Sequence, residues 1–493
     1  MKYQSTRNAG EQVSASEAVV NGLAPDGGLY VPAKLPHFDE TELRSMLAMD
    51  YCGRAELIIK KFLPEYSESE VKALVSAAYA EGYDDSATAP TRFVDEKTGF
   101  LELWHGPTCA FKDMALQMLP HLLTAALKKC GETRRICILV ATSGDTGKAA
   151  LEGFADVPGT KILVFYPRDG VSEVQRLQMV TQSGENVLVK AVDGNFDDAQ
   201  SGVKAIFNDR AFSNSVEERG WLLSSANSIN WGRLLPQIVY YFSAYCDFVN
   251  FGGIKFGEKL NFSVPTGNFG DILAGWYAKK TGLPTGRLIC ASNANNVLTD
   301  FIASGVYDRN RPFHTTVSPS MDILLSSNLE RLLYSLCGSD SEVSGYMQTL
   351  AETGRYEISD TLRRAIAEDF SAYFCDDAET LREIRAVRDD SRYLMDTHTA
   401  VAHRALRDYR AATGDKTPAV VVSTASPFKF CDSVLSALGE STDAPGTELI
   451  ERLAQISGAA IPEGIRGLAK KPIRFSDCVG KDEMRAAVEG FLA

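Results

Sequence analysis

From about residue 95 onward, short apolar runs alternate with amphipathic segments. The runs at 136–143 (ICILVATS), 161–166 (KILVFY) and 260–265 (LNFSVP) are apolar on both faces of an extended strand. Strands of this kind, separated by helices, are typical of parallel sheets that are covered on both sides. We therefore predict an α/β fold with more than one such sheet. The other predicted strands are 186–192, 287–291 and 419–423, and the predicted helices are 146–154, 171–182, 448–457 and 482–492.

The two ends of the chain differ from this central part. The start has helical patterning over 40–83, and residues 84–91 (DDSATAPT) have the composition of a linker. Residues 325–410 are patterned mostly as helix. We therefore expect an N-terminal domain at 1–92, a catalytic core of two α/β subdomains at 93–440 with a helical insertion near 325–410, and a C-terminal helical extension at 441–493.

Composition and charge narrow the class of protein. Apolar residues make up 45% and charged residues 23% of the 493, which is ordinary for a globular chain and argues against a disordered one. The formal net charge is −13, from 51 Lys plus Arg against 64 Asp plus Glu. An acidic balance of this size opposes non-specific binding to nucleic acid.

Membrane, metal and redox signals are missing from the sequence. No apolar run approaches the ~20 residues that span a bilayer, and no secretory signal is visible. The ten cysteines are scattered without zinc-finger or redox spacing. We therefore expect a soluble, cytoplasmic protein that has no metal site and that binds neither nucleic acid nor membrane.

Two glycine-rich turns follow predicted strands. TSGDTG at 142–147 follows the strand at 136–143, and PTGNFGD at 265–271 follows the strand at 260–265. Such turns can present backbone N–H groups to a phosphate or a carboxylate at a helix N-terminus. A tight turn capped by a short polar side chain is the alternative. A nucleotide P-loop and a GxGxxG dinucleotide turn are both excluded by the residues present.

The segment HGPTCAFKDM at 105–114 places a lysine at the start of an apolar helix. Apolar residues recur at helical spacing after it, which indicates a buried helix face. Burial and the positive end of the helix both disfavour the ammonium form of Lys112. A neutral lysine is a nucleophile suited to a Schiff base. A solvated lysine at a helix start is the alternative that the spacing alone favours.

Two further groups of polar residues could take part in ligand binding or catalysis. NSINWGR at 227–233 combines amides, a hydroxyl and a guanidinium, which can hold a phosphate or can cap the helix that follows. His398 could act as a general base, although a helix cap is the better-supported interpretation. The chain has neither the G-x-S-x-G turn of a hydrolase nor an HExxH metal motif.

Six segments, in this order along the chain, resemble the threonine synthases, which are pyridoxal-phosphate-dependent enzymes of fold type II. They are EQVSASEAVVNGLAPDGGLYVP, HGPTCAFKDMALQ, ATSGDTGKAA, NSINWGRLLPQ, PTGNFGDILAG and STASPFKF. The resemblance covers nearly the whole chain. It implies a tryptophan synthase β-like fold, in which two parallel-rich sheets are covered by helices and the cofactor lies in the cleft. A small N-terminal domain is added to this core.

The resemblance also implies roles for individual residues. Lys112 would form the Schiff base with pyridoxal 5'-phosphate, and Thr424 would face the pyridine nitrogen. The cofactor phosphate would be bound by Gly267, Asn268, Phe269, Gly270 and Asp271. The substrate would be bound at its carboxylate by Ser143, Gly144, Asp145 and Thr146, and at its phosphate by Asn227, Ser228, Asn230 and Arg233. Cys109 departs from the family pattern, in which we expect glycine or an aliphatic residue, and this change could affect pocket volume or thiol sensitivity.

The implied reaction converts O-phospho-L-homoserine and water to L-threonine and phosphate, by γ-elimination and β-addition of water. A pyridoxal-phosphate-dependent phospho-lyase that gives 2-oxobutyrate, ammonia and phosphate from the same substrate is the alternative. A third hypothesis is a non-catalytic relative that binds an anionic metabolite. The presence of Lys112 argues against it, because a binding protein has no need for a Schiff-base lysine. The partner is thus a small molecule, and the protein is expected to be a monomer or a homodimer.

Overall fold

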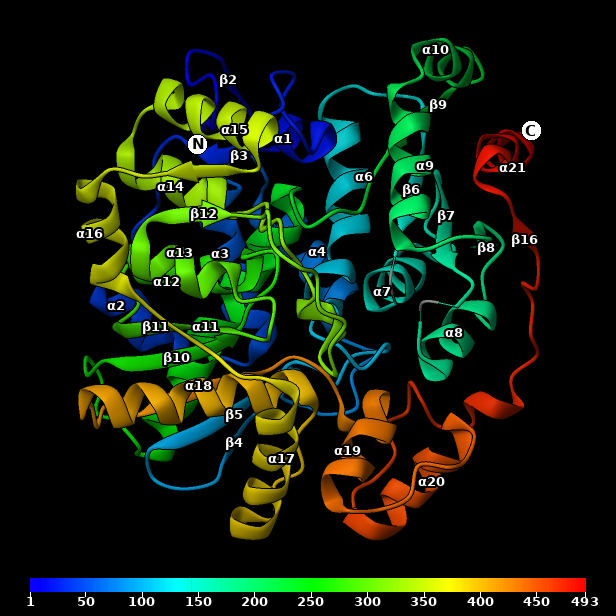
Figure 1. Cartoon of the computed structure of the whole chain (residues 1–493). Helices are drawn as coiled ribbons and strands as arrows, with labels where there is room; N and C mark the ends of the chain where they lie inside the picture. Colours follow the sequence, from blue (N-terminus) through cyan, green and yellow to red (C-terminus); the bar gives the residue numbers. More distant parts are fainter. Residues whose placement is uncertain (143, 170) are drawn as a thin grey trace.

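Two parallel-rich sheets lie side by side in the computed structural model, which describes residues 1–142, 144–169 and 171–493. The six-stranded sheet occupies the left half of Figure 1, and the five-stranded sheet occupies the right half. Helices cover both sheets (Figure 1). The α/β fold with more than one parallel-rich sheet is therefore confirmed.

The larger sheet provides most of the core. Its strand order is β14 (Phe370–Phe374), β11 (Thr285–Ser292), β10 (Leu260–Pro265), β15 (Ala419–Ser423), β5 (Thr98–Glu102) and β4 (Thr91–Phe93). All neighbouring strands are parallel except β4 and β5. The central strands β10 and β15 are buried over their whole length, as expected for a sheet covered on both faces. The helices around it include α5 (Asp113–Leu116), α6 (Leu119–Lys129), α11 (Trp231–Phe251), α12 (Gly270–Lys280) and α13 (Val297–Ser304).

The smaller sheet is parallel throughout. Its order is β16 (Cys478–Val479), β8 (Val187–Val192), β7 (Thr160–Pro167), β6 (Arg135–Ala141) and β9 (Trp221–Ser224). Alternate residues of β6 face opposite sides, so that Ile138 joins the main core and Leu139 joins a second apolar cluster. The flanking helices are α7 (Asp145–Phe154), α8 (Glu173–Val180), α9 (Phe196–Asn208), α10 (Arg210–Glu218) and α21 (Met484–Leu492).

The N-terminal segment packs directly on the core. It comprises an antiparallel sheet of β1 (Tyr3–Ser5), β2 (Gln12–Val13) and β3 (Tyr30–Pro32), with α1 (Ala15–Asn21), α2 (Glu40–Met46), α3 (Tyr51–Phe62) and α4 (Glu68–Tyr79). The ring of Trp231 on α11 lies 5.3 Å from the ring of Tyr3 and 5.9 Å from that of Phe62. The N-terminal segment and α11 therefore share one apolar interior, and the boundary at residue 92 stays a prediction.

Residues 325–410 are mostly helical, as expected, but they also supply a strand of the larger sheet. The elements here are α14 (Leu329–Cys337), α15 (Asp340–Thr353), β13 (Arg355–Glu357), α16 (Asp360–Asp369), β14, α17 (Asp377–Ser391) and α18 (Thr397–Thr413), and β13 pairs with β12 (Val306–Asp308). The sequence analysis did not predict β14. This edge strand has five residues and only Phe370 is fully buried, so its apolar pattern is too short to stand out.

The predicted helices near the C-terminus are confirmed. Residues 448–457 lie in α20 (Gly446–Ser457), and 482–492 end in α21. The remaining elements are α19 (Cys431–Leu438) and the 3-10 helices η1 (Pro319–Met321), η2 (Pro427–Phe430), η3 (Leu468–Lys470) and η4 (Lys481–Glu483). In the described part of the chain, none of the helices combines the length and the apolar character that crossing a membrane requires.

Candidate active site

The segment that carries Lys112 is hydrogen-bonded to the loop after β15. The N–H of Phe111 donates to the carbonyl of Thr424 at 2.8 Å, and the N–H of Ser426 donates to the carbonyl of Cys109 at 3.1 Å. The start of α7, which follows β6 of the smaller sheet, lies on the other side of Lys112. The site is therefore built at the carboxyl ends of strands from both sheets, where open α/β folds bind their ligands.

Lys112 is a mostly buried amine that immediately precedes α5. Its side chain is 13% exposed, and its Nζ lies 3.9 Å from Oδ2 of Asp145. Burial lowers the pKa of Lys112; Asp145 opposes this shift, whereas the positive charges of Lys429 and Arg233 add to it. These surroundings favour the neutral amine that the sequence analysis expected.

Asp145 lies between two lysines. Its Oδ1 is 2.7 Å from Nζ of Lys429 and accepts a hydrogen bond from Nε2 of Gln175 at 2.9 Å. Burial alone would raise the pKa of the Asp145 carboxyl, but Lys429 and Lys112 outweigh burial and hold this pKa well below its usual range. Asp145 is therefore a carboxylate, and its charge would repel a substrate carboxylate. Only the backbone of this residue suits the binding role that the resemblance implies.

The turn at 142–147 is organised by Thr142. Its Oγ1 accepts hydrogen bonds from the N–H groups of Gly144 and Gly147, both at 3.0 Å. Gly144 has φ 145°, and a Cβ there would lie 2.5 Å from the Gln175 side chain, so no other residue fits. Helix α7 begins at once and points its first N–H groups out of this turn. Thr146 is partly exposed in it, and Ser143 lies outside the described residues.

In the turn after β10, backbone carbonyl groups accept hydrogen bonds from the protein, whereas backbone N–H groups have no partners among the described residues. The carbonyl of Gly267 accepts from Oγ of Ser326 at 2.7 Å, and the carbonyl of Asn268 accepts from the N–H of Asn328 at 3.1 Å. Phe269 has φ 64°, a left-handed conformation that turns the chain sharply before α12. Within the described part of the chain, the N–H groups from Gly267 to Gly270 donate no hydrogen bond. These N–H groups form a cup for an anion.

Asp271 is held by two tyrosines. Its Oδ1 accepts from the hydroxyl of Tyr240 at 2.6 Å and from that of Tyr241 at 2.8 Å. Its Oδ2 is buried and has no partner in the described part of the chain. Burial raises the pKa of Asp271 to about 6, although the tyrosine hydroxyls and the charge of Lys112 oppose this shift. A carboxylate would repel the cofactor phosphate, so the predicted phosphate contact of Asp271 suits its backbone N–H.

Arg233 is a buried guanidinium with spare donors. Its Nη1 donates to the carbonyl of Ala226 at 2.6 Å, while its Nε is buried and has no partner among the described residues. No carboxylate in the described part of the chain lies within ion-pair distance of it. Burial lowers the pKa of Arg233 to about 10, which still leaves it charged at neutral pH. An unpaired buried cation of this kind fits an anionic ligand.

The other predicted phosphate ligands differ in availability. The side chain of Asn230 is already occupied, since its Oδ1 accepts from the N–H of Gly232 and its Nδ2 donates to the carbonyl of Val19. Ser228 is partly exposed, and its carbonyl accepts from Nδ2 of Asn328. Asn227 is exposed. Ser228 and Arg233 therefore have the side chains best placed for a phosphate, and the roles of Asn227 and Asn230 stay predictions.

Thr424 lies beside the Lys112 segment, whereas the ring of His398 is held by other residues. Thr424 is buried directly after β15, beside the Lys112 segment, so its predicted contact with the pyridine nitrogen stays open to test. His398 is also buried, with Nδ1 2.7 Å from Oδ2 of Asp396 and with Nε2 accepting from the N–H of Ser320 at 3.1 Å. Both ring nitrogens are occupied, so His398 has a structural role and the general-base interpretation is wrong.

Cys109 has the backbone conformation of a glycine. Its φ is 60°, in the left-handed region that side chains disfavour. The side chain is buried, and burial raises the pKa of its thiol to about 12. The departure from the expected glycine or aliphatic residue therefore places a buried, unreactive thiol on a strained backbone.

Three charged or polar residues of the site were missed by sequence reasoning. Lys429, Asn328 and Arg331 are all buried. Arg331 donates from Nε to the carbonyl of Tyr30 at 3.0 Å and contacts the carbonyl of Ile229, so it joins the N-terminal segment to the 227–233 segment. The only available signal was the position of Lys429 within STASPFKF, a segment that the resemblance had already singled out.

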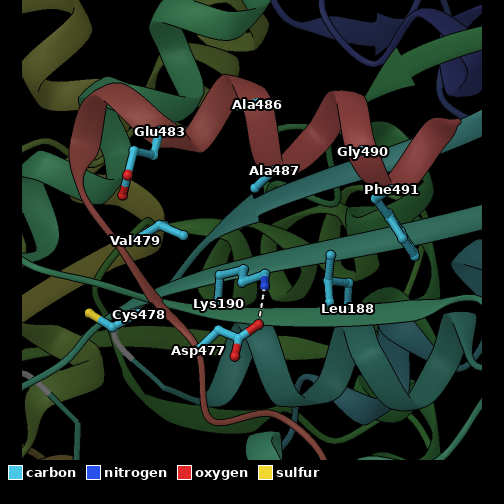
Figure 2. A pocket seen from close by; sticks show the side chains of 10 residues that line it. All are labelled: Leu188, Lys190, Asp477, Cys478, Val479, Glu483, Ala486, Ala487, Gly490 and Phe491. Carbon is cyan, nitrogen blue, oxygen red and sulfur yellow. Dashed lines mark hydrogen bonds and ion pairs between the residues drawn. The ribbon is translucent and has the colours of Figure 1, made fainter.

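A separate cavity of about 690 Å³ lies away from this cluster, between β8 and α21 (Figure 2). Lys190 and Asp477 form an ion pair at its floor, and Ala486, Ala487 and Phe491 of α21 face it (Figure 2). None of the predicted site residues lines it.

The cluster fits pyridoxal phosphate. It supplies a mostly buried lysine whose pKa is lowered by burial, and a cup of N–H groups that donate no hydrogen bond among the described residues. These features define the class of fold-type-II pyridoxal-phosphate enzymes, and residues 100–425 match the family model "Pyridoxal-phosphate dependent enzyme". Residues 2–79 match "Threonine synthase N terminus", and residues 399–489 match "Threonine synthase, C-terminal". The chain belongs to the threonine synthase family, and its cofactor is pyridoxal phosphate.

Individual relatives agree with this placement. The threonine synthase of Pseudomonas aeruginosa is 39% identical over 92% of this chain and 94% of its own. The structure of the PLP-bound threonine synthase of Brucella melitensis superposes with a TM-score of 0.89 at 36% identity, covering 100% of this chain and 99% of that one. Human threonine synthase-like 1 is 41% identical over 87% of this chain, and the chain spans 59% of the length of that protein.

Proposed function

We propose that this protein is a threonine synthase, a carbon–oxygen lyase that converts O-phospho-L-homoserine and water to L-threonine and phosphate. The observation that carries the proposal is one buried lysine, with its pKa lowered by burial, in a cluster that also contains two separate groups of donors without partners among the described residues. Lys112 lies in the cluster with the N–H cup at Gly267–Gly270 and with the unpaired guanidinium of Arg233. A phosphorylated cofactor and a phosphorylated substrate need two such sites.

The two phosphates are divided between these sites. The N–H cup would hold the cofactor phosphate, because it lies at the N-terminus of α12, where backbone N–H groups favour an anion. Arg233, with the hydroxyl of Ser228, would hold the substrate phosphate, since a guanidinium binds phosphate with several parallel hydrogen bonds. The N–H groups of Asp145 and Thr146, in the first turn of α7, would receive the substrate carboxylate, since the N–H of Gly144 is already bonded to Thr142.

Lys112 supplies the acid–base chemistry. Because burial lowers its pKa, the Lys112 amine would be the group that holds the cofactor covalently through the cofactor aldehyde. The cofactor supplies an electron sink for negative charge that develops on carbon atoms of the substrate. Once released from the cofactor, the Lys112 amine can take the proton from the α carbon and move protons at the β carbon. After phosphate leaves from the γ carbon, the same amine would return a proton to that carbon, which becomes the methyl group of threonine. The β carbon would then accept the hydroxyl group of water.

The surroundings of the amine limit side reactions. Lys112 is 13% exposed, so few water molecules reach its amine. Thr424, if it faces the pyridine nitrogen, provides a neutral hydroxyl there instead of a carboxylate. That choice leaves the nitrogen less firmly protonated.

The remaining assignments are also proposals. We keep an N-terminal domain at 1–92, a core at 93–440 with a helical insertion near 325–410, and an extension at 441–493. The family-model matches at 2–79 and 100–425 support the first two, whereas the match at 399–489 begins inside the proposed core. We place the enzyme in the cytoplasm, acting on a small-molecule substrate as a monomer or a homodimer.

A product balance tests the proposed function. The purified protein is incubated with pyridoxal phosphate and O-phospho-L-homoserine, and phosphate, threonine and 2-oxobutyrate are measured together. Threonine equal to phosphate supports the synthase. Phosphate matched by 2-oxobutyrate and ammonia would make the protein a phospho-lyase, and no phosphate at all would refute both activities.

A further inference from the structure

Lys429 is a fully buried lysine at the meeting point of three segments. Its Nζ lies 2.7 Å from Oδ1 of Asp145, at the start of α7, and donates to the carbonyl of Thr108 at 2.9 Å. The side chain has no exposed surface. Thr108 lies in the loop that leads to Lys112, so one ammonium group connects η2, that loop and α7. A buried ammonium is stable only where its charge is balanced, and Asp145 balances it.

The two oxygens of Asp145 are unequally engaged. Oδ1 receives the ammonium of Lys429 and the amide of Gln175. Oδ2 faces Lys112 at 3.9 Å, which is too long for a hydrogen bond. The carboxylate is therefore turned toward Lys429, and Lys112 interacts with it only through space.

The other charged groups that face Lys112 are only partly engaged elsewhere, since Nε of Arg233 and Oδ2 of Asp271 have no partner among the described residues. On its own helix, Asp113 accepts from the N–H of Thr108 at 2.8 Å and from its hydroxyl at 2.6 Å. The remaining charged groups that act on Lys112 are Asp145 of α7, Lys429 of η2, Arg233 of α11 and Asp271 of α12, whose Oδ1 is bound by Tyr240 and Tyr241.

We propose that Lys429 is a positioning residue that occupies the Asp145 carboxylate and thereby keeps the Lys112 amine free of a proton. The inference rests on the proposed role of Lys112 as the nucleophile. With Lys429 in place, a protonated Lys112 would add a further positive charge to a buried cluster that already contains Arg233. Without Lys429, the carboxylate of Asp145 is free to bind Lys112 directly and to stabilise its ammonium form.

The direction of the electrostatic effects supports this inference. Lys429 lowers the pKa of Lys112, after burial and against the opposing effect of Asp145. Removal of Lys429 therefore raises the pKa of Lys112 by two routes, which are the loss of a neighbouring positive charge and the release of Asp145. A neighbouring opposite charge typically shifts a pKa by one to three units, and each unit changes the neutral fraction about tenfold.

The test measures the protonation of Lys112 without turnover. The full chain, freed of cofactor, is acetylated briefly with acetic anhydride at a series of pH values, because only the neutral amine reacts. Mass spectrometry compares the Lys112 peptide with that of Lys34, an exposed lysine that serves as the internal reference. In Lys429→Gln, which can still hydrogen-bond to Asp145 and Thr108, acetylation of Lys112 at pH 8 should fall about tenfold.

Two further variants separate charge from shape. Lys429→Arg keeps the positive charge, so its acetylation profile should stay close to that of the wild type. If Lys429→Gln does not fold, Asp145→Asn/Lys429→Arg is compared with Asp145→Asn/Lys429→Met, since a guanidinium keeps its charge without a carboxylate partner and neither protein leaves a buried carboxylate unpaired. Lys112 acetylation should then be at least about threefold lower in the variant with Met.

The outcomes are distinct from those of the proposed function. A profile in Lys429→Gln that overlays the wild type, or equal acetylation in the two Asp145→Asn proteins, would overturn the role of Lys429. Neither result depends on which product the enzyme forms, so the product balance can fail while this inference holds.

Discussion

The side-chain amide of Asn230 donates from Nδ2 to the backbone carbonyl of Val19 at 2.9 Å. Its Oδ1 accepts from the N–H of Gly232 at 2.8 Å, so the same side chain caps α11. Val19 lies in α1, and Arg233 lies in the first turn of α11. The N-terminal segment is thus tied directly to the helix that presents the proposed substrate-phosphate ligand.

Asn230→Ala should weaken both the fold and substrate binding. Loss of the cap and of the Val19 bond should lower the free energy of unfolding by about 1–2 kcal/mol. The KM for O-phospho-L-homoserine should rise more than kcat falls, because Arg233 loses its fixed position. Urea titration and steady-state kinetics measure the two effects.

Asn250 offers a matched control at the other end of α11. Its Nδ2 donates to the carbonyl of Leu47 at 2.9 Å, at an exposed position. Asn250→Ala should leave the KM unchanged. An Asn230→Ala enzyme with the KM of the wild type would show that the N-terminal contact does not orient the site.

Lys112→Ala should abolish turnover and covalent attachment of the cofactor. No other group in the cluster combines a buried neutral amine with the proposed contact to the reacting carbons. After incubation with pyridoxal phosphate and reduction with borohydride, the wild type should gain the mass of the reduced cofactor on the Lys112 peptide. Lys34→Ala, at an exposed lysine, should retain both properties. Unchanged turnover in Lys112→Ala would refute the assignment of the lysine.

Arg233→Met should raise the KM for the phosphorylated substrate about 10- to 100-fold, which corresponds to the loss of charge-assisted hydrogen bonds. Arg233→Lys keeps the charge but not the planar fork, so its defect should be intermediate. Arg364→Met, at an exposed position on α16, is the control and should behave as the wild type. If the Met variant keeps its KM, the substrate phosphate binds elsewhere.

The sequence could predict the buried strands but not the polar pairs between distant segments. The predicted ranges 260–265 and 419–423 agree with β10 and β15 residue for residue, because fully buried strands are short, mostly apolar runs with clear ends. β14 was missed, since an edge strand with one fully buried residue has little pattern. Lys429 sits between two phenylalanines and has no local sign of burial. Its partner Asp145 is far away in the sequence, and the two residues come together only when the two sheets pack in the folded chain.

His105 should make stability fall as the pH rises. Its Nδ1 lies 2.5 Å from Asp84 and its Nε2 lies 2.9 Å from Glu102, at the start of the segment that carries Lys112. Burial alone would lower the pKa of His105, but these carboxylates outweigh it and raise the pKa to about 9. The stabilisation is fully present below the unfolded pKa of about 6.5 and is lost as the pH passes about 9.

Urea titrations at pH 6 and pH 10 test this prediction. The difference in unfolding free energy between the wild type and His105→Gln should shrink by up to about 3 kcal/mol over this interval. The corresponding difference for His37→Gln, at an exposed position, should be small at both pH values. A His105→Gln difference that does not change with pH would contradict the raised pKa.

Substitutions at Cys109 should change the stability of the protein through backbone strain, and the Cys109 thiol should react slowly with thiol reagents. Because φ is 60° there, Cys109→Gly should be more stable than Cys109→Ala by about 1 kcal/mol, as measured by urea titration. Iodoacetamide at pH 8 should label the exposed Cys130 and Cys478 well before Cys109, whose pKa is about 12. Rapid labelling of Cys109, or greater stability of the alanine variant, would contradict this description.

The most direct test of the central claim follows the oxygen atom of water. The enzyme is supplied with O-phospho-L-homoserine in water enriched in oxygen-18, and both products are analysed by mass spectrometry at early times. Elimination at the γ carbon followed by addition of water at the β carbon predicts labelled oxygen in the hydroxyl of threonine and released phosphate without label. Homoserine together with labelled phosphate would show hydrolysis at phosphorus and would contradict the proposed chemistry of Lys112 and its two anion sites.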